Sequence, residues 1–356
     1  MLGIIMAGGQ GTRLMPLTLY RPKPMVEVLG RPVIDYVKEA MVDAGVREIV
    51  VTTGYQGQQL AEHVATWNLL REDGNQVHAQ INQESTPMGT AGSVGLLRDM
   101  VTETCVVGSG DAIASFDIAD LLQSHRESNA MVTMALWEVD DPSQFGIVGL
   151  SGTPDGEVDS TLRQGYIRRF LEKPSPEEAF SNVINAGLYI LEPEVFDHIP
   201  VAEKFDFSKQ LFPLLLELQI PLFAKAIEGI WFDVGQPEEL LRAQRTLLEH
   251  FQSLPFTFPE GYEQEGGNLI SCTSTIFGEI LDSVVARNCT IHDGAKVHQS
   301  LLMDGTLVGQ KSTISNSVLG SKVVVGKNCI INGCVLGDGI TIDDGESRVG
   351  ERYPAP

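Results

Sequence analysis

The sequence is poor in several features that define well-known classes of protein. It holds five cysteines, an odd number with no CxxC pair, which indicates reduced structural cysteines rather than a disulfide scaffold. Its seven histidines show no HExxH or other ligand spacing, so we expect no zinc site. No apolar run approaches the roughly 20 residues that span a bilayer, and the N-terminus has no secretory signal pattern. We therefore expect a cytoplasmic protein that does not contact membranes.

Basic residues are also scarce. The 356 residues include 47 Asp and Glu against 25 Lys and Arg, which gives a formal charge of −22 at pH 7. Such a chain is a poor partner for nucleic acid or for an anionic membrane surface, because both attract basic patches. The exception is the stretch 1–26, which has no acidic residue and carries Arg13, Arg21 and Lys23. This basic island predicts that an anionic ligand is small and is bound locally.

Residues 2–250 alternate short apolar runs with segments of helical periodicity. The alternation predicts an α/β fold with a mostly parallel sheet and helices on both faces, whose ligands bind beyond the carboxyl ends of the strands. The predicted strands are 2–6, 48–53, 77–81, 104–107 and 131–139, and the predicted helices are 32–44, 56–70, 90–97 and 118–125.

A different pattern follows residues 251–267, whose prolines and glycines predict a linker. Residues 268–345 show a hexapeptide repeat, which is typical of a parallel β-helix whose coils cover one another's apolar edges. At roughly 18 residues a coil, this stretch holds about four coils, and 346–356 is predicted to be a loose tail. The predicted domains are thus 1–250 and 268–345. The repeat places apolar residues at Leu302, Val308, Ile314, Val324, Ile330, Leu336 and Ile342.

The loop after the first predicted strand has the composition of a phosphate-binding site. Glycines let backbone N–H groups approach a phosphate closely, and arginine and lysine supply positive charge. A dinucleotide-binding GxGxxG motif would open a helix, whereas Pro16 follows here, and the GK[ST] of a Walker loop is absent. A bare glycine-rich turn does not account for so long a string. It reads Ala7-Gly8-Gly9-Gln10-Gly11-Thr12-Arg13-Leu14-Met15-Pro16-Leu17-Thr18, then Arg21-Pro22-Lys23-Pro24-Met25.

This string resembles the signature of the sugar-phosphate nucleotidyltransferase family, GGxGTRLxPLT followed by PKPM. The resemblance implies a Rossmann-like catalytic domain followed by a left-handed β-helix, whose apolar coil ends and faces also predict a homo-oligomer contact. One departure is Ser109, where many members of the family have asparagine. Further segments match the family, namely Gly89-Thr90-Ala91-Gly92, Gly110-Asp111, Glu172-Lys173-Pro174, Asn185-Ala186-Gly187 and Trp231-Phe232-Asp233-Val234-Gly235.

The family resemblance implies transfer of a nucleotidyl group from a nucleoside triphosphate to a sugar 1-phosphate, with release of pyrophosphate. The attacking phosphate is already ionised at neutral pH, since its second pKa is near 6, so no general base is needed. The resemblance also implies that Asp111 and Asp233 are Mg²⁺ ligands. It implies that Arg13, Lys23 and Lys173 are the catalytic cations. The implied nucleotide contacts are Ala7, Gly8, Gly9, Gly11, Thr12, Gln83, Gly89 and Thr90, and the implied sugar-phosphate contacts are Gly146, Glu172, Lys173, Asn185 and Gly187.

The nucleotide and the sugar are less strongly indicated. The segment from Gln83 to Gly92 is similar to the QExxPLGTAG pattern of mannose-1-phosphate guanylyltransferases, which implies GDP-mannose synthesis. A glucose-1-phosphate thymidylyl- or uridylyltransferase is the alternative. An acyltransferase active in the β-helix would need a longer β-helix and a catalytic histidine between coils. A regulatory subunit that only binds the nucleotide sugar would usually lack residues of the phosphate loop or a metal-binding aspartate, and all are present here.

Overall fold

The computed structural model describes residues 1–54, 57–68, 76–251 and 258–355. The contacts between residues divide the chain into two compact units. Unit 1 consists of Met1–Gly9 and Ile34–Trp231, and unit 2 of Gln10–Val33 and Phe232–Pro356. The boundary therefore passes through the glycine-rich loop. Residues 10–33 group with the C-terminal part of the chain, although the sequence pattern placed them in the first domain.

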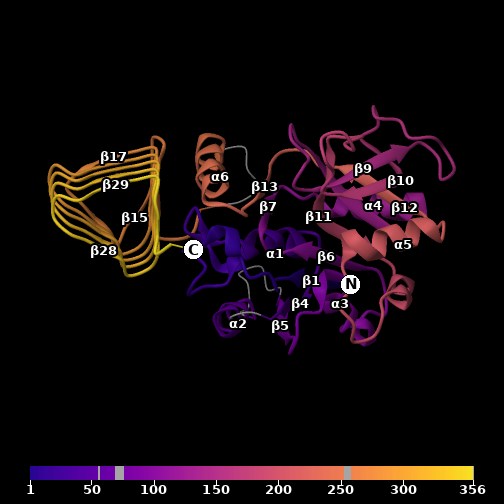
Figure 1. Cartoon of the computed structure of the whole chain (residues 1–356). Coiled ribbons are helices and arrows are strands. Elements are labelled where there is room, and N and C mark those ends of the chain that lie inside the picture. The colour runs from indigo at the N-terminus through magenta and orange to yellow at the C-terminus, as the bar shows by residue number, and fades with distance from the viewer. Residues whose placement is uncertain (55–56, 69–75, 252–257, 356) are drawn as a thin grey trace. The chain divides into compact units, whose positions relative to one another are not determined.

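Within its described residues, unit 1 holds a nine-stranded sheet (Figure 1). Seven of the nine strands run in one direction, and β10 and β11 run in the other. The order is β5 (His78–Gln83), β4 (Glu48–Thr53), β1 (Leu2–Met6), β6 (Cys105–Ser109), β11 (Val183–Leu191), β8 (Val132–Glu138), β12 (Leu222–Ala226), β10 (Gln164–Glu172) and β9 (Gly146–Ser151).

The first four strands along the chain form an entirely parallel half of this sheet. β1 pairs in parallel with β4 on one side and with β6 on the other, and β4 pairs with β5. The chain thus moves outward from β1 in one direction and then continues on the other side of it, which makes β1 and β6 the point where the strand order reverses. Ligands of open α/β sheets bind at such a point.

Helices connect the strands of unit 1 at the predicted places. The predicted helix 56–70 is confirmed over Gly57–Thr66, while residues 56, 69 and 70 lie outside the described residues. α4 shows how the sequence sets a boundary, because Asp117 caps it by accepting the N–H of Asp120 at 2.9 Å. The remaining elements are α1 (Ile34–Asp43), α2 (Gly57–Thr66), α3 (Gly89–Gly95), η3 (Arg98–Met100), β7 (Ala112–Ala114), α4 (Ile118–Ser128), η4 (Pro193–His198), η5 (Phe207–Leu211) and α5 (Phe212–Glu217).

Unit 2 combines the segment 10–33 with a helix and a stack of short strands. Residues 252–257 of the predicted linker lie outside the described residues, and β14 then pairs antiparallel with β15. The elements before the stack are η1 (Thr12–Leu14), η2 (Lys23–Met25), β2 (Glu27–Val28), β3 (Arg31–Pro32), β13 (Trp231–Asp233, which begins in unit 1), α6 (Pro237–Glu249) and β14 (Tyr262–Glu265).

The stack is the predicted parallel β-helix, and Figure 1 shows its coils as a triangle with three faces. Each face is one parallel sheet, and within residues 258–355 the strands complete five coils, one more than predicted. The faces are β15 (Asn268–Ser271), β18 (Val284–Val285), β21 (Leu301–Leu302), β24 (Val318–Leu319), β27 (Val335–Leu336) and β30 (Arg352–Tyr353); β16 (Thr275–Ile276), β19 (Thr290–Ile291), β22 (Leu307–Val308), β25 (Val324–Val325) and β28 (Thr341–Ile342); and β17 (Glu279–Leu281), β20 (Lys296–His298), β23 (Thr313–Ser315), β26 (Ile330–Asn332) and β29 (Ser347–Val349).

From Val284 onward the period of the coil is 17 residues, as in the pairing of Leu301 with Val318, whereas the first coil is shorter and pairs Leu269 with Val284. Two steps of six residues and one of five make this period, because the turn between the third face and the first is one residue shorter. The prediction of uninterrupted six-residue steps is therefore wrong at two positions. Val324 and Ile330 are 38% and 53% exposed, and their neighbours Val325 and Ile331 fill the core instead.

The turns of the β-helix repeat as faithfully as its strands. Three columns of residues with positive φ run along it, one at each corner. Glycine adopts this conformation at little cost, and asparagine tolerates it. One such column consists of Asp282, Gln299, Asn316, Gly333 and Gly350. The left-handed backbone conformation forms the corner of each coil. Lysine and glutamine therefore adopt it as well where they occupy a corner position.

The loose tail predicted for 346–356 is wrong for most of its length. β29 pairs in parallel with β26, and β30 pairs in parallel with β27, so the chain continues the coil as far as Tyr353. The tail looked polar because its repeat lacks the apolar spacing. Arg348 instead pairs with Glu346 at 2.8 Å and with Glu351 at 3.1 Å, and both partners lie in the same last coil.

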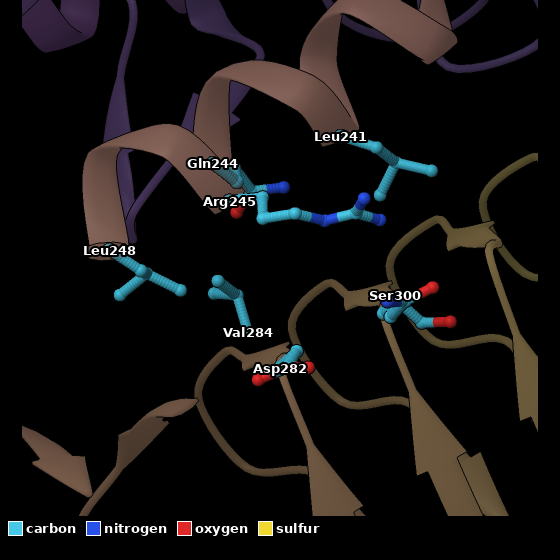
Figure 2. Close-up of a pocket in the computed structure, with 8 residues that line it drawn as sticks. Leu241, Gln244, Arg245, Leu248, Asp282, Val284 and Ser300 are labelled. Carbon is cyan, nitrogen blue, oxygen red and sulfur yellow. The ribbon is translucent and has the colours of Figure 1, made fainter. Parts of the chain in front are cut away.

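α6 lies against one face of the β-helix within unit 2. A cavity of about 10 Å³ remains between them, lined by Leu241 and Leu248 on the helix and by Asp282 and Val284 on the β-helix (Figure 2). The side-chain amide of Gln244 is buried beside it without a protein partner among the described residues. This volume is at the lower limit of what one water molecule needs.

None of the helices in the described residues is both long and apolar enough to cross a membrane.

The corrected phase of the repeat is testable with neighbouring isoleucines. Ile331→Ala should destabilise the protein by about 2–5 kcal/mol, because it leaves a cavity in the β-helix core. Ile330→Ala should stay within about 0.5 kcal/mol of the wild type, since that side chain is exposed. Denaturant unfolding followed by circular dichroism measures both. A larger loss for Ile330→Ala would contradict the register described above.

Candidate functional site

The carboxyl ends of the parallel strands in unit 1 are joined by backbone hydrogen bonds beyond the strands themselves. The N–H of Ala7 donates to Thr52 at 2.9 Å, and that of Glu84 donates to Thr53 at 2.8 Å. The N–H of Gly110 donates to the carbonyl of Met6 at 2.9 Å. Three of the predicted site segments therefore begin side by side, at the edge of the sheet where a ligand is expected.

Glu84 lies close to the loop after β1 and supports the base-contacting loop. The sequence did not reveal this role. Its carboxylate accepts hydrogen bonds from the hydroxyl of Ser93 at 2.5 Å and from the N–H of Met88 at 3.4 Å. A Cβ on Gly8 would lie 3.4 Å from the same carboxylate, and a Cβ on Gly54 would lie 3.0 Å from it. Glycines here allow the glutamate to approach the backbone closely.

The predicted base-contacting loop at Gly89 and Thr90 is held by the segment before η5. The hydroxyl of Thr90 donates to the carboxylate of Asp206 at 2.9 Å and accepts the N–H of Phe207 at 3.0 Å. The N–H of Phe205 donates to the carbonyl of Met88 at 2.8 Å. Gly89 has a φ of 73°, and a Cβ there would lie 2.6 Å from the carbonyl oxygen of Phe205. Only glycine fits this approach.

The same segment reaches Glu172, one of the predicted sugar contacts. Burial raises the pKa of Glu172, with Asp206 adding to the effect, while Lys173, Lys209 and a hydrogen bond from Ser208 lower it. Glu172 pairs with Gly146 at the start of β9, where a Cβ would lie 2.8 Å from the carboxylate. Gly146 is therefore needed for the close approach of Glu172, as well as for any approach of a ligand.

Lys173 follows at the end of β10 with a φ of 49°, and its N–H donates to the carbonyl of Phe145 at 2.8 Å. The lysine side chain itself is exposed. A left-handed residue turns the chain sharply away from the strand. The exposed ammonium thus stands at a fixed corner beside the half-buried carboxylate of Glu172.

Asn185 and Gly187 lie where β11 breaks its regular pairing with β8. The amide of Asn185 donates to the hydroxyl of the buried Tyr189 at 2.8 Å and accepts the N–H of Gly187 at 2.9 Å. A Cβ on Gly187 would lie 3.2 Å from the Cβ of Ser109. The irregularity therefore brings the Asn-Ala-Gly segment to the end of β6.

Ser109 is the position that departs from the family pattern, and it retains a polar role. Its hydroxyl donates a short hydrogen bond to the carboxylate of Asp111. A serine here thus orients the aspartate that the sequence assigned to metal binding. The contacts thus link the base-contacting loop to Glu172 through the segment around Asp206. A second set links Asn185 to Asp111 through Gly187 and Ser109.

In unit 2 the second half of the glycine-rich loop forms the 3₁₀ turn η1. Gly11 starts it with a φ of 63°, and its carbonyl accepts the N–H of Leu14 at 3.0 Å and the hydroxyl of Thr18 at 2.8 Å. A Cβ on Gly11 would lie 2.9 Å from the Cβ of Lys23. The glycine therefore allows the two halves of the signature to pack together.

Lys23, Arg13 and Asp233 form a charged cluster in unit 2. The ammonium of Lys23, whose side chain is 9% exposed, lies 3.1 Å from one carboxylate oxygen of Asp233. The guanidinium of Arg13 lies 3.9 Å from the other oxygen and is 51% exposed. A buried ammonium requires a partner of opposite charge. Two of the predicted catalytic cations and one predicted metal ligand thus lie together in unit 2.

Arg21, the third cation of the basic island, does not join this cluster. Its guanidinium donates to Asp338 at 2.6 Å and to Ser321 at 2.9 Å, both in the β-helix. The side chain is only 14% exposed. Arg21 is thus engaged in a structural ion pair.

Comparison with known proteins agrees with the geometry. A family model described as "Nucleotidyl transferase" matches residues 2–250, and one described as "GMPPB C-terminal domain" matches residues 276–349. The chain belongs to the nucleotidyl transferase family. The recognition from the signature string is confirmed.

Similar proteins from animals and plants cover most of the chain. The "Mannose-1-phosphate guanylyltransferase catalytic subunit beta" of Danio rerio is 31% identical over 332 residues, which is 88% of this chain and 87% of the relative. The "Probable mannose-1-phosphate guanylyltransferase 1" of Oryza sativa subsp. japonica is 31% identical over 339 residues, with 88% and 87% covered. The protein of Drosophila pseudoobscura pseudoobscura that carries the same name as the zebrafish one is 30% identical over 331 residues, with 87% and 84% covered.

The metal ligands predicted for this nucleotidyl transferase are carboxylates, whose oxygens are ligands that Mg²⁺ takes. Across the residues that the structure describes, no group of three or more His, Cys, Asp or Glu side chains is placed to hold a metal ion. The two candidate ligands are single carboxylates, Asp111 in unit 1 and Asp233 in unit 2. One or two carboxylates, completed by substrate phosphates and water, are a common Mg²⁺ site. Each carboxylate by itself therefore has the chemistry of a Mg²⁺ ligand.

The need for glycine at position 89 can be measured against a matched glycine. Gly89→Ala and Gly45→Ala both place alanine at a positive φ, which costs about 1–2 kcal/mol. Only Gly89→Ala also meets backbone, because a Cβ on Gly45 has no neighbour within 4 Å. Gly89→Ala should therefore lower the unfolding midpoint more than Gly45→Ala does. Equal midpoints for the two variants would show that Phe205 yields without cost.

Proposed function

We propose that this chain transfers a guanylyl group from GTP to mannose 1-phosphate, giving GDP-mannose and pyrophosphate. The observation that carries the proposal is the cluster of Lys23, Arg13 and Asp233 beside the glycine-rich turn η1. It is the arrangement that a polyphosphate needs, with cations in place and a carboxylate for a divalent ion. The relatives described as mannose-1-phosphate guanylyltransferases supply the nucleotide and the sugar.

The reaction joins two polyanions, so the residues around them must offset charge. Two like charges 4 Å apart repel by about 4 kcal/mol at an effective dielectric of 20. Arg13 would hold the β- and γ-phosphates as they leave, since a planar guanidinium binds two phosphate oxygens at once. Lys23 would exchange its partner Asp233 for the α-phosphate. Ala7, Gly8, Gly9, Gly11 and Thr12 would offer backbone N–H groups to the phosphates, and Gln83, Gly89 and Thr90 would contact the base.

We assign binding of the sugar 1-phosphate to the residues around Glu172 and Asn185. Lys173 would hold the phosphate of the incoming sugar, and Glu172, Asn185 and Gly187 would contact its hydroxyls, with Gly146 leaving room for them. A Mg²⁺ ion held by Asp111 and Asp233 would supply alignment of the phosphates and neutralise charge that develops on them. The attacking phosphate is ionised, so these residues bind and orient it without removing a proton.

The other predicted properties belong to the same proposal. We place the catalytic domain in residues 1–250, the linker in 251–267 and the β-helix domain from residue 268 onward. The partners are a nucleoside triphosphate and a sugar 1-phosphate in the cytoplasm, with a homo-oligomer contact through the β-helix.

The proposal is tested by pyrophosphate release from the full chain with four nucleoside triphosphates and two sugar phosphates. GTP with mannose 1-phosphate should give the fastest release. A faster reaction of dTTP or UTP with glucose 1-phosphate would establish the alternative substrate pair, and no release with any pair would leave a nucleotide-sugar-binding role. Asp111→Asn and Asp233→Asn should each abolish Mg²⁺-dependent release. Undiminished release by both variants would remove the metal assignment.

The raised pKa of Glu172 gives a pH dependence with a definite sign. Because burial raises this pKa above the ordinary 4.5, acidification protonates Glu172 at a higher pH than an exposed glutamate. A protonated Glu172 accepts fewer hydrogen bonds from a sugar. The KM for the sugar phosphate should therefore rise as the pH falls toward the raised pKa, and Glu172→Gln should remove this part of the rise.

Glu177→Gln, at an exposed position in the same loop, is the matched control. All variants share the protonation of the substrate phosphate, so differences between their KM profiles come from the enzyme. Superimposable profiles for Glu172→Gln and the wild type would contradict a sugar contact at Glu172.

A further inference from the structure

One corner of the β-helix carries a column of polar residues that repeats with the coil. Arg287, Asp304, Ser321 and Asp338 occupy equivalent positions, and hydrogen bonds join the first two members and the last two. The N–H of Arg287 donates to Asp304 at 3.0 Å, and the N–H of Ser321 donates to Asp338 at 2.9 Å. The column is therefore a polar edge of unit 2 in which three of the four side chains are charged.

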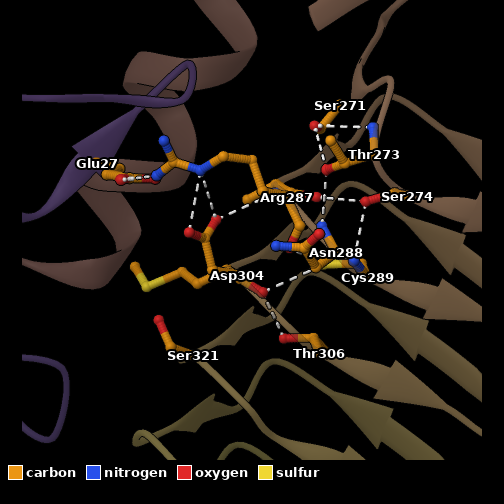
Figure 3. A network of polar contacts seen from close by, with 12 residues as sticks. Glu27, Ser271, Thr273, Ser274, Arg287, Asn288, Cys289, Asp304, Thr306 and Ser321 are labelled. Atoms are coloured by element: carbon orange, nitrogen blue, oxygen red, sulfur yellow. Dashed lines mark hydrogen bonds and ion pairs between the residues drawn. The ribbon is translucent and has the colours of Figure 1, made fainter. Parts of the chain in front are cut away.

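The segment that carries the predicted phosphate-binding cations is attached to this edge. Glu27 accepts from Arg287 at 2.9 Å, as Figure 3 shows, and Arg287 also contacts Asp304 at 3.0 Å. Arg21 donates to Ser321 and Asp338 of later coils. The segment thus runs along successive coils, with its later residues on the earlier coils and its earlier residues on the later ones.

The last coil reaches the turn that contains Arg13. The guanidinium of Arg352 donates to the backbone carbonyl of Arg13 at 2.9 Å and lies 3.2 Å from the carboxylate of Glu238 in the first turn of α6. A Cβ on Gly337 would lie 3.2 Å from the Cβ of Pro16, so the chain just after Arg13 also packs closely on the coil.

Arg352 also stands out within its own sheet. The equivalent positions in the preceding coils are all apolar and buried, and they lie outside the core cluster of the β-helix. At the sixth position of this column an arginine replaces the apolar side chain. The column consists of Leu269, Val284, Leu301, Val318, Val335 and Arg352.

The hydrogen bond from Arg352 to the carbonyl of Arg13 stabilises the end of the short helix η1. η1 has three residues and no side-chain cap at its start. Carbonyls at a helix end lack the N–H groups of a following turn, and a cation there satisfies and stabilises them. Arg352 supplies that cation, and through Glu238 it joins the turn to the helix that follows Asp233. The side chain of Arg13 stays half exposed while its backbone is held.

We propose that Arg352 is a positioning residue for nucleotidyl transfer, holding the Arg13 turn against the start of α6. The proposal rests on the function proposed above, in which Arg13 binds the departing phosphates. The β-helix then does more than pack against other surfaces. Its last coil sets the place from which the Arg13 guanidinium approaches Asp233 and the nucleotide.

The test compares the full-length variants Arg352→Ala, Arg352→Lys and Arg348→Ala. Arg348 is the matched control, because it lies in the last coil and pairs only with residues of that coil among the contacts described above. Arg352→Ala should lower kcat/KM for the nucleotide by about 10- to 100-fold, the range expected when a reacting group is misplaced by about 1 Å. The KM for the sugar phosphate should not change, Arg352→Lys should recover part of the loss, and Arg348→Ala should match the wild type.

Two further measurements separate positioning from stability. In an Arg13→Ala background, Arg352→Ala should cause no additional loss of kcat/KM. Hydrogen exchange of the amides of residues 12–15 should accelerate in Arg352→Ala and not in Arg348→Ala. Wild-type kinetics for Arg352→Ala, an equal loss in Arg348→Ala, or unchanged exchange would each overturn the proposal. A wild-type chain that releases no pyrophosphate would end the proposed function, and the exchange comparison would still decide whether Arg352 holds the turn.

Discussion

A lysine ammonium that is almost buried has to lie beside a carboxylate, and much of unit 2 follows from the pairing of Lys23 with Asp233. The pair joins a residue near the start of the chain to one more than 200 positions later. Segment 10–33 therefore packs with the C-terminal part of the chain. Gly11 is glycine because Lys23 lies against it, and Arg13 lies on the other side of the same carboxylate.

In unit 1 the constraint is of another kind. Parallel strands carry their loops to one edge of the sheet, and the loops must then be supported individually. Glu84 supports the base-contacting loop, Asp206 supports Thr90, and Ser109 supports Asp111. Each support comes from a polar side chain close to a predicted contact residue. These supports leave the predicted contact residues in fixed positions.

The sequence predicted the fold and the family because these leave periodic or compact signals. The strand at Leu2–Met6 is confirmed residue for residue, and the family follows from the signature strings. The roles given to Arg13, Lys23 and Asp233 stay predictions. Long-range partners leave no such signal. Nothing near Arg21 in the sequence indicates Asp338, and Arg352 is one of two arginines in the polar stretch 346–356.

The local sequence pattern also did not determine which of two neighbouring apolar residues points into the core of the β-helix. Val324 and Val325 are equally apolar, as are Ile330 and Ile331, so a six-residue template fits either choice. Only the 17-residue pairing between coils decides which of each pair points inward. The polar tail was misjudged for the same reason, since Arg348 and Glu346 continue the coil with charge where the template requires apolar residues.

Because the coils of the β-helix stack at a regular spacing, the number of coils determines where the last coil lies relative to the turn that contains Arg13. Segment 13–27 meets successive coils in order, from Arg287 to Arg352. Deleting one whole coil would keep the same kind of core contact between the remaining coils. It would nevertheless shift Arg352 by one strand spacing, about 4.8 Å, away from the turn that it holds. Lengthening at the C-terminal end would bury that arginine under a new coil. The length of the β-helix is therefore constrained by its contacts with segment 13–27 as well as by its own core.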